Sequence, residues 1–248
     1  MIKLVISGIA GRMGKRIGRL ASKDKALEIS SGLESPDNPA IGKDIGEVIE
    51  IGRIGKNIES DFEKVAKDCD ALIEFTFPSV TMEHLEIACK NKVGMVIGTT
   101  ALSSEQIEEI RNSSREIPIV FSPNMSVGAN LLFKITEIVS RALSKDYKVE
   151  IVEAHHAKKK DAPSGTAKRL SEAVLKVRGK TPPIQSIREG DIVGDHTVRF
   201  SEQVETIELV HRAHSRDAFA KGALNAARFV VGKKPGLYSM QDVIGASS

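Results

Sequence analysis

The feature that most restricts the fold of this chain is a glycine-rich turn directly after its first apolar run. That run, Lys3–Ser7, leads into Gly8–Gly14, and a helical pattern follows over residues 11–22. Glycines let backbone N–H groups at a helix start approach a pyrophosphate closely, and the helix dipole favours the anion. The spacing is G-x-x-G-x-x-G, with Ala10 where a second glycine is usual. Its place after the first strand favours cofactor binding over a purely structural turn.

The second half of a dinucleotide-binding pattern is an acidic residue about 20 positions further on. Glu34 lies at that spacing, after a predicted strand over residues 27–32. A carboxylate there accepts hydrogen bonds from both ribose hydroxyls and repels a 2′-phosphate, while Ser35 stands where an arginine would hold that phosphate. The pair therefore favours NADH. NADPH stays open because Arg12 could supply positive charge, and a solvated loop carboxylate is the alternative interpretation of Glu34.

The order of apolar runs and helical patterns predicts the architecture. Strands alternate with helices in the first half, which indicates a parallel sheet covered on both faces; the predicted strands are residues 3–7, 27–32, 71–76, 95–98 and 119–121, and the helices are 11–22, 80–91 and 103–114. After Pro123 the pattern predicts helices over 127–143, 165–177 and 217–231, and strands over 149–152, 197–200 and 206–210. The last two strands are expected to pair antiparallel. We predict an α/β fold: a Rossmann-type, doubly wound parallel sheet with a second, smaller α+β domain.

Composition excludes several classes of protein. The 36 Lys and Arg residues against 33 Asp and Glu leave a net charge of +3, and aromatic residues are 4% with no Trp, so we expect no nucleic-acid partner. Two well-separated cysteines, Cys69 and Cys89, argue against a disulfide framework or a zinc site and fit a reducing compartment. No apolar run approaches the ~18 residues of a membrane span, and we expect no signal peptide because the sequence opens directly with a strand-like run. The expectation is a cytoplasmic protein that binds neither membranes nor a metal.

The segment Glu153–Ala167, read E-A-H-H-A-K-K-K-D-A-P-S-G-T-A, is the most informative for chemistry. It begins at a predicted strand end and finishes at a helix start, where Ser164 is a suitable N-cap and the following N–H groups can bind an anion. The preceding lysines suggest an anionic ligand, and the two adjacent histidines offer a proton donor near neutral pH. Three lysines alone are more often a solvated face, and a His pair is sometimes a metal site. Together, the elements favour an anion-binding catalytic loop.

These motifs resemble one family. The glycine turn, E-F-T at Glu74–Thr76, I-G-T-T at Ile97–Thr100 and the His155–His156 segment are similar to those of the 4-hydroxy-tetrahydrodipicolinate reductases, also called dihydrodipicolinate reductases. The similarity continues through G-D-I-V-G-D-H-T at Gly190–Thr197, then Ser215-Arg216 and Gly236–Met240, and so covers almost the whole chain in order.

The resemblance implies reduction of 4-hydroxy-tetrahydrodipicolinate by NADH or NADPH in the diaminopimelate route to lysine. It implies that His155 is the proton donor and Lys159 a second catalytic group. It places the substrate carboxylates at His156 and at the backbone of Gly165 and Thr166. It also implies a cofactor site formed by Gly8, Ile9, Ala10, Gly11, Arg12, Met13, Glu34, Gly98, Thr99, Thr100, Ser122, Pro123, Asn124 and Met125.

The resemblance further implies that the end of the chain returns to complete the first domain, and that four copies assemble through the second-domain sheets. The expected division is 1–124 plus 216–248 for the dinucleotide-binding domain, and 125–215 for the substrate-binding and oligomerisation domain. The chain departs from the family at Ser35, which bears on coenzyme choice. It also departs between Leu175 and Ile187, where we expect a shortened surface loop. The alternatives are another two-domain dehydrogenase of small amino or keto acids, such as an aspartate dehydrogenase, and a non-catalytic NAD(H)-sensing or nucleic-acid-binding protein.

Overall fold

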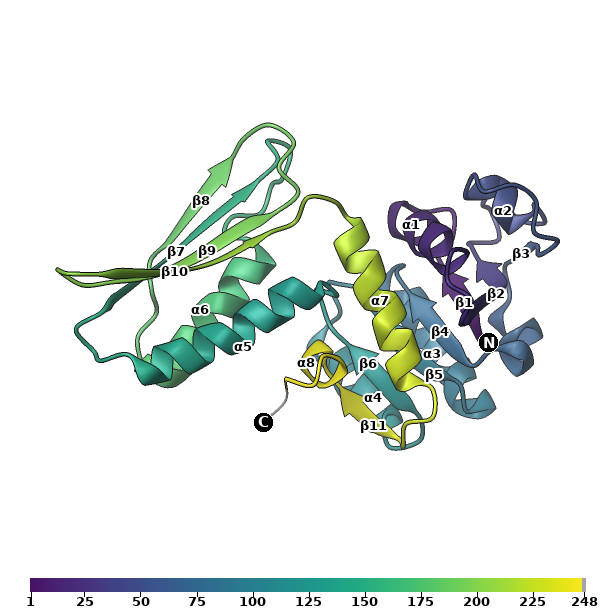
Figure 1. Cartoon of the computed structure of the whole chain (residues 1–248). Coiled ribbons are helices and arrows are strands. Elements are labelled where there is room, and N and C mark those ends of the chain that lie inside the picture. Colours follow the sequence, from purple (N-terminus) through teal and green to yellow (C-terminus); the bar gives the residue numbers. More distant parts are fainter. Residues whose placement is uncertain (247–248) are drawn as a thin grey trace. The chain divides into compact units, whose positions relative to one another are not determined.

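A computed structural model describes residues 1–246 of the chain, which form two compact units (Figure 1). The first unit contains Met1–Met125 and Phe219–Val243, and the second contains Ser126–Ala218 with residues 244–246. None of the helices among the described residues is long and apolar enough to cross a membrane.

The first unit is built on a seven-stranded sheet in which every neighbouring pair is parallel. Its strands are β1 (Ile2–Ser7), β2 (Leu27–Leu33), β3 (Ile58–Glu59), β4 (Ala71–Glu74), β5 (Gly94–Ile97), β6 (Pro118–Phe121) and β11 (Gly236–Tyr238). The spatial order is β3-β2-β1-β4-β5-β6-β11. The chain therefore winds outward from β1 in one direction and then from β4 in the other, which confirms the doubly wound Rossmann-type sheet. Ligands of such sheets bind at the carboxyl ends of the strands where the order reverses, here between β1 and β4.

Helices cover both faces of this sheet. The longer ones are α1 (Arg12–Ala21), α3 (Pro78–Asn91), α4 (Ser104–Ser113) and α7 (Asp217–Val230); shorter ones are α2 (Ile45–Val48), α8 (Met240–Val243) and the 3₁₀ turns η1 (Phe62–Lys64) and η2 (Ala66–Asp68). Leu85 of α3 and Ile110 of α4 pack with Met95 and Ile97 on one face. On the other face α7 brings Val230 close to Gly94 of β5. The predicted start of α4 is confirmed by a complete capping box between Ser103 and Gln106.

The second unit has a mixed four-stranded sheet in the order β10-β9-β7-β8. The strands are β7 (Lys148–His155), β8 (Ile184–Arg188), β9 (Asp195–Ser201) and β10 (Thr206–Arg212), and α5 (Val127–Ala142) and α6 (Gly165–Arg178) lie side by side on one face (Figure 1). The predicted antiparallel pairing of β9 with β10 is confirmed.

The sequence pattern gave no strand between the helix at 165–177 and residue 197, and this was wrong. Strand β8 lies in that interval and pairs parallel to β7 through the α6 crossover. We expected the segment between Leu175 and Ile187 to contain a surface loop. Only the part between the end of α6 and the start of β8 is a loop, and the rest belongs to these two elements. The run Ile184–Arg188 has polar residues at three of five positions, so its pairing with β7 depends on the sheet and not on a local apolar pattern.

Candidate functional site

The glycine turn has the geometry of an anion cradle. Gly8 has φ of +75°, a conformation that residues with a Cβ rarely adopt. A Cβ on Gly14 would meet the backbone of the turn, at 2.6 Å from Ile9 Cα and closer still to the Gly8 carbonyl oxygen. Gly11 is the N-cap of α1, and within residues 1–246 no side chain caps this helix start and no acidic residue lies in its first turn. The start of α1 therefore offers N–H groups and the positive end of the helix dipole to an anion.

Glu34 closes the other side of this turn. Its Oε1 accepts a hydrogen bond from the Ala10 N–H at 2.7 Å, and its Oε2 accepts one from the Asn38 side-chain amide at 2.9 Å. The carboxylate is thus held in place at the end of β2 and is not a freely solvated loop side chain. Ser35 follows it at the edge of the same cavity.

Two adjoining hollows surround the turn. One, of about 590 Å³, is lined by Gly8, Ala10–Arg12, Glu34, Ser35 and the residues after β4. The other, of about 270 Å³, is lined by Gly11–Met13, Phe75, Thr76 and Gly98–Thr100. Ile9 itself is fully buried and its side chain packs against Gly32, so it supports the turn from beneath. The structure therefore brings together the expected cofactor residues that follow β1, β2 and β5.

The remaining cofactor candidates, Ser122–Met125, follow β6. The Ser122 N–H donates to the carbonyl of Ile97 at 3.2 Å, which ties this segment to the end of β5. The Ser122 hydroxyl donates to the Asn124 carbonyl at 2.8 Å, and Met125 is buried beneath α7, where only a glycine at position 222 fits. These residues lie at the same carboxyl edge of the sheet, although they line neither of the two hollows.

A buried acid–histidine pair beside this cavity was not predicted. Glu74, at the end of β4, is fully buried, and its Oε2 lies 2.7 Å from Nδ1 of His84 on α3. The other oxygen accepts the hydroxyl of Thr76, and His84 lines the larger hollow. The sequence indicated no chemistry for His84, since a lone histidine on a helix is not distinctive. The pair fixes the E-F-T segment next to the glycine turn.

In the second unit, strand register gathers a second group of polar side chains. Glu153 and His155 are two residues apart on β7, so their side chains share a face of the sheet. Across the ladders, His196 of β9 lies opposite Glu153, and Arg188 of β8 lies opposite His155. His211 of β10 is in turn opposite His196. We call Glu153, His155, Arg188 and His196 the buried cluster.

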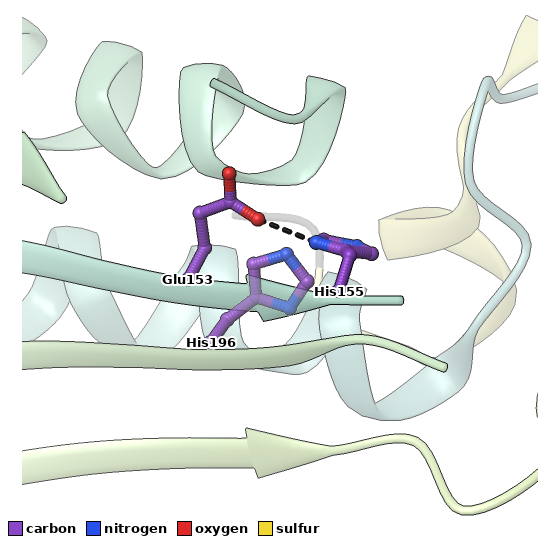
Figure 2. Close-up of side chains that lie close together, drawn as sticks. All are labelled: Glu153, His155 and His196. Atoms are coloured by element: carbon purple, nitrogen blue, oxygen red, sulfur yellow. Dashed lines mark hydrogen bonds and ion pairs between the residues drawn. The ribbon is translucent and has the colours of Figure 1, made fainter. Parts of the chain in front are cut away.

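Glu153 is the centre of this cluster and is fully buried (Figure 2). Its Oε2 bonds with Nδ1 of His155, and its Oε1 accepts from Arg188 Nη2 at 2.7 Å and from the Ser164 N–H at 3.3 Å. Burial raises the pKa of Glu153, but hydrogen bonds from Arg188, Ser186 and His155 outweigh it and lower that pKa to about 2. The carboxylate is therefore ionised at neutral pH.

The two histidines of the cluster lie in edge-to-face contact, with ring centroids 5.1 Å apart. Burial lowers the pKa of His155 below its ordinary value, while the hydrogen bond to Glu153 acts in the opposite direction. Burial, together with the charges of His155 and His211, lowers the pKa of His196 to about 3, so this ring is neutral. Its Nε2 lies 3.3 Å from the hydroxyl of Ser164, the N-cap of α6.

The loop after His155 carries the other expected substrate residues. Lys159 pairs with Asp161 at 2.7 Å, and the Asp161 carbonyl accepts from Arg188 Nη2 at 2.6 Å. The His156 N–H donates to the Ile192 carbonyl at 2.7 Å, so the loop is held against the turn before β9. The backbone at the start of α6, Gly165 and Thr166, follows directly on Ser164, whose N–H reaches Glu153.

Gly165 has open space where a Cβ would project. The structure therefore brings His155, Lys159 and the helix start into one network. Sequence reasoning had included Glu153 only as part of the motif, had given His196 no role and had missed Arg188.

Glu153, His155 and His196 each offer one atom within 4.8 Å of the others, a spacing that could hold a metal ion. Arg188 occupies one oxygen of Glu153, and Lys159 adds a further positive charge near His155. Because Arg188 already pairs with this carboxylate and Lys159 places a second positive charge near the imidazole, the donor set fits a proton-transfer site better than a cation site.

Comparisons with known proteins show the family and agree with this fold. Models of the N-terminus and C-terminus of dihydrodipicolinate reductase match residues 2–125 and 128–244. The 4-hydroxy-tetrahydrodipicolinate reductases of Syntrophus aciditrophicus and Geotalea uraniireducens are 42% and 43% identical to this chain, over 100% and 99% of both sequences. A dipicolinate-bound dihydrodipicolinate reductase from Paenisporosarcina sp. TG-14 has the same fold, with a TM-score of 0.83, 22% identity and coverage of 98% of this chain and 99% of that one.

The parallel sheet, the glycine cradle and these matches define an NAD(P)H-dependent oxidoreductase with a nucleotide-binding Rossmann domain. More closely, the chain belongs to the dihydrodipicolinate reductase family. This confirms the resemblance found in the sequence, and it sets aside the aspartate-dehydrogenase-like and the non-catalytic alternatives.

Proposed function

We propose that this chain reduces 4-hydroxy-tetrahydrodipicolinate to tetrahydrodipicolinate with a reduced nicotinamide dinucleotide, in the diaminopimelate route of lysine biosynthesis. The observation that carries the proposal is the buried Glu153–His155 pair beside the anion-binding start of α6. The names of the relatives, at 42–43% identity over the full length, support the substrate, as does the dipicolinate bound to the similar solved structure.

The first unit has the residues that would hold the cofactor. The start of α1 would take the pyrophosphate, because the glycines leave no Cβ in its path, and Glu34 would accept ribose hydroxyls. Gly98–Thr100 and Ser122–Met125 would border the nicotinamide half. When bound, the reduced nicotinamide supplies the hydride. We propose a preference for NADH, since the Glu34 carboxylate disfavours a 2′-phosphate and Ser35 offers it no positive charge.

The second unit would hold the substrate. His156, Lys159 and the N–H groups of Gly165 and Thr166 would bind the two carboxylates and fix the ring. Loss of the 4-hydroxyl as water would give a conjugated imine, which accepts the hydride. The ring is then an enamine that must take a proton. Protonated His155 would supply that proton, and Lys159 would polarise the ring or relay the proton. A dianionic ligand would raise the pKa of His155, against the effect of burial, and so keep the donor protonated.

We also propose that four copies assemble and that the protein acts in the cytoplasm. Within the second unit, α5 and α6 lie on one face of the sheet, and none of the described helices of that unit covers the opposite face (Figure 1). Val210 of β10 is 46% exposed and Val204, before it, is 87% exposed. Such apolar edges are typical of surfaces that pair between copies. The unpaired Cys69 and Cys89 suit a reducing compartment.

The test is the loss of nicotinamide absorbance when purified protein meets freshly made condensation product of pyruvate and aspartate semialdehyde. NADH and NADPH are assayed separately. We expect rapid oxidation of the coenzyme when pyruvate and aspartate semialdehyde have been condensed, and none when either of these two reactants is supplied alone. If the protein binds NADH but oxidises neither NADH nor NADPH in the presence of fresh substrate, the proposed function is overturned.

A further inference from the structure

Glu153 makes contacts that a solely structural ion pair does not need. Its two oxygens point in different directions: one bonds His155 Nδ1, and the other bonds Arg188 and the backbone N–H of Ser164 (Figure 2). One buried carboxylate therefore contacts both the expected proton donor and the residue that caps the expected anion-binding helix. Neither the sequence motif nor the comparisons assign it a role.

We infer that Glu153 is a positioning residue that holds His155 with the proton on Nδ1, so that Nε2 is the nitrogen that faces the ligand. This inference rests on the proposed function. An ionised carboxylate accepts a hydrogen bond and cannot donate one, so the His155 Nδ1 in contact with it has to carry a proton in both the neutral and the charged ring. The proton that His155 gives away must then come from Nε2.

The surroundings of Nε2 agree with this assignment. Gly194, the residue before β9, lies beside it: a Cβ at that position would stand 3.1 Å from Nε2 and 3.4 Å from the adjacent ring carbon. Any side chain there would crowd the nitrogen. His196 contacts the ring of His155 edge to face and so restricts its rotation. The glycine leaves space at Nε2, while Glu153 and His196 fix the ring.

Arg188 extends the arrangement to the second expected catalytic group. Its Nη2 bonds both Glu153 and the Asp161 carbonyl, and the Asp161 side chain pairs with Lys159. The titratable and charged groups that face His155 are therefore Glu153 from its own strand, Arg188 from β8, His196 from β9 and Lys159 from the loop. Of these, only Glu153 is negative, and it alone stabilises the imidazolium.

The main test is Glu153→Gln, which keeps the size of the side chain and removes its charge. The matched control is Glu150→Gln on the same strand, where the carboxylate is half-exposed and bonds Arg199 at 2.5 Å. We expect kcat of Glu153→Gln to fall by about tenfold or more, since the donor is misoriented and less often protonated. The alkaline limb of its kcat–pH profile should move to lower pH, while Glu150→Gln changes neither. Glu153→Asp, which keeps the charge, should restore the position of that limb.

A second measurement does not depend on a folded variant of Glu153. In ¹⁵N-histidine-labelled protein, with the His155 signals assigned through His155→Gln, the neutral ring should be the Nδ1–H tautomer. An Nε2–H tautomer, or a Glu153→Gln enzyme with wild-type kcat and pH profile, would overturn the inference. Failure of the proposed function is distinguishable, since wild-type protein would then oxidise neither NADH nor NADPH while the tautomer could still be measured.

Discussion

Gly14→Ala should destabilise the protein and weaken cofactor binding through one added methyl group. The new Cβ would lie 2.6 Å from Ile9 Cα and 2.7 Å from the Gly8 carbonyl carbon, and closer still to the carbonyl oxygen, whereas real Cβ atoms essentially never come within 3.0 Å. All three are backbone atoms of the glycine turn, so no side-chain rotation relieves the contact. The distance to Ile9 Cα alone is 0.4 Å shorter than that limit, so the turn has to move away from α1 by more than this amount.

Overpacking of this kind costs about 1–3 kcal/mol, and here the upper part of that range applies because only backbone can yield. Replacing glycine by alanine inside a helix returns up to about 1 kcal/mol of helix propensity. The net expectation is a loss of about 2 kcal/mol in the free energy of unfolding. Since the same backbone forms the anion cradle, NADH affinity should fall by about tenfold or more, which corresponds to about 1.4 kcal/mol.

The assays are urea unfolding followed by circular dichroism and titration of NADH fluorescence. Gly165→Ala is the stability control, because this residue also lies in a first helical turn but its Cβ would meet nothing within 4 Å; its stability should be unchanged or higher. Gly11→Ala, with a single close approach of 3.0 Å to Gly8, should be milder than Gly14→Ala. If Gly14→Ala had wild-type stability and NADH affinity, the turn would not be the rigid cradle that we describe.

Four further predictions test other parts of the molecule. His155→Ala should lower kcat by about 10²-fold or more, as expected for loss of a general acid, with little change in NADH affinity; an unchanged kcat would remove His155 from that role. Ser35→Arg should raise kcat/KM for NADPH relative to NADH by about tenfold or more, because a guanidinium can pair with the 2′-phosphate, and an unaltered ratio would contradict our account of coenzyme choice. Because the folded-state pKa of His196 is lowered to about 3, its contribution to stability is full above about pH 6.5 and is lost progressively as the pH falls towards 3. At pH 5 the loss is about 2 kcal/mol, and His196→Gln should reduce this pH dependence of the free energy of unfolding in urea. If wild type and variant had the same pH dependence, His196 would not be a buried neutral ring. His84→Leu should cost about 3 kcal/mol of stability, since it removes the histidine partner of the buried Glu74 carboxylate. Adding Glu74→Gln should recover part of that loss, and strictly additive losses in the double-mutant cycle would contradict the pairing.

The elements that sequence reasoning predicted well are those whose signals are local. The β1 strand, the glycine turn and α1 follow one another without a gap, and every residue in the turn contributes to the pattern. The start of α4 was equally readable, since Ser103 and Gln106 satisfy one another's backbone groups within a single turn. In such elements, the residues that stabilise the structure lie within a few positions of the structure that they stabilise.

Strands β3 and β8 were missed because they have no such local cause. Strand β3 is two residues long and exists only as a partner of Gly32 and Leu33 at the end of β2. Strand β8 follows two prolines and is polar at three of its five positions, so its backbone is extended mainly because β7 offers it hydrogen bonds. A pattern search cannot predict a strand whose main stabilising partner is elsewhere in the chain.

The same distinction explains what could be predicted of the candidate site. The segment from Glu153 to Thr166 is contiguous, so its strand end, loop and helix start could all be read from one stretch of sequence. Arg188 is 35 residues from Glu153 along the chain, and its contact exists because β8 places it opposite His155 in the sheet. His196 likewise reaches the cluster through the register of β9. The sequence therefore indicated the expected proton donor, whereas the groups that fix its tautomer and its charge depend on strand register and required the folded structure.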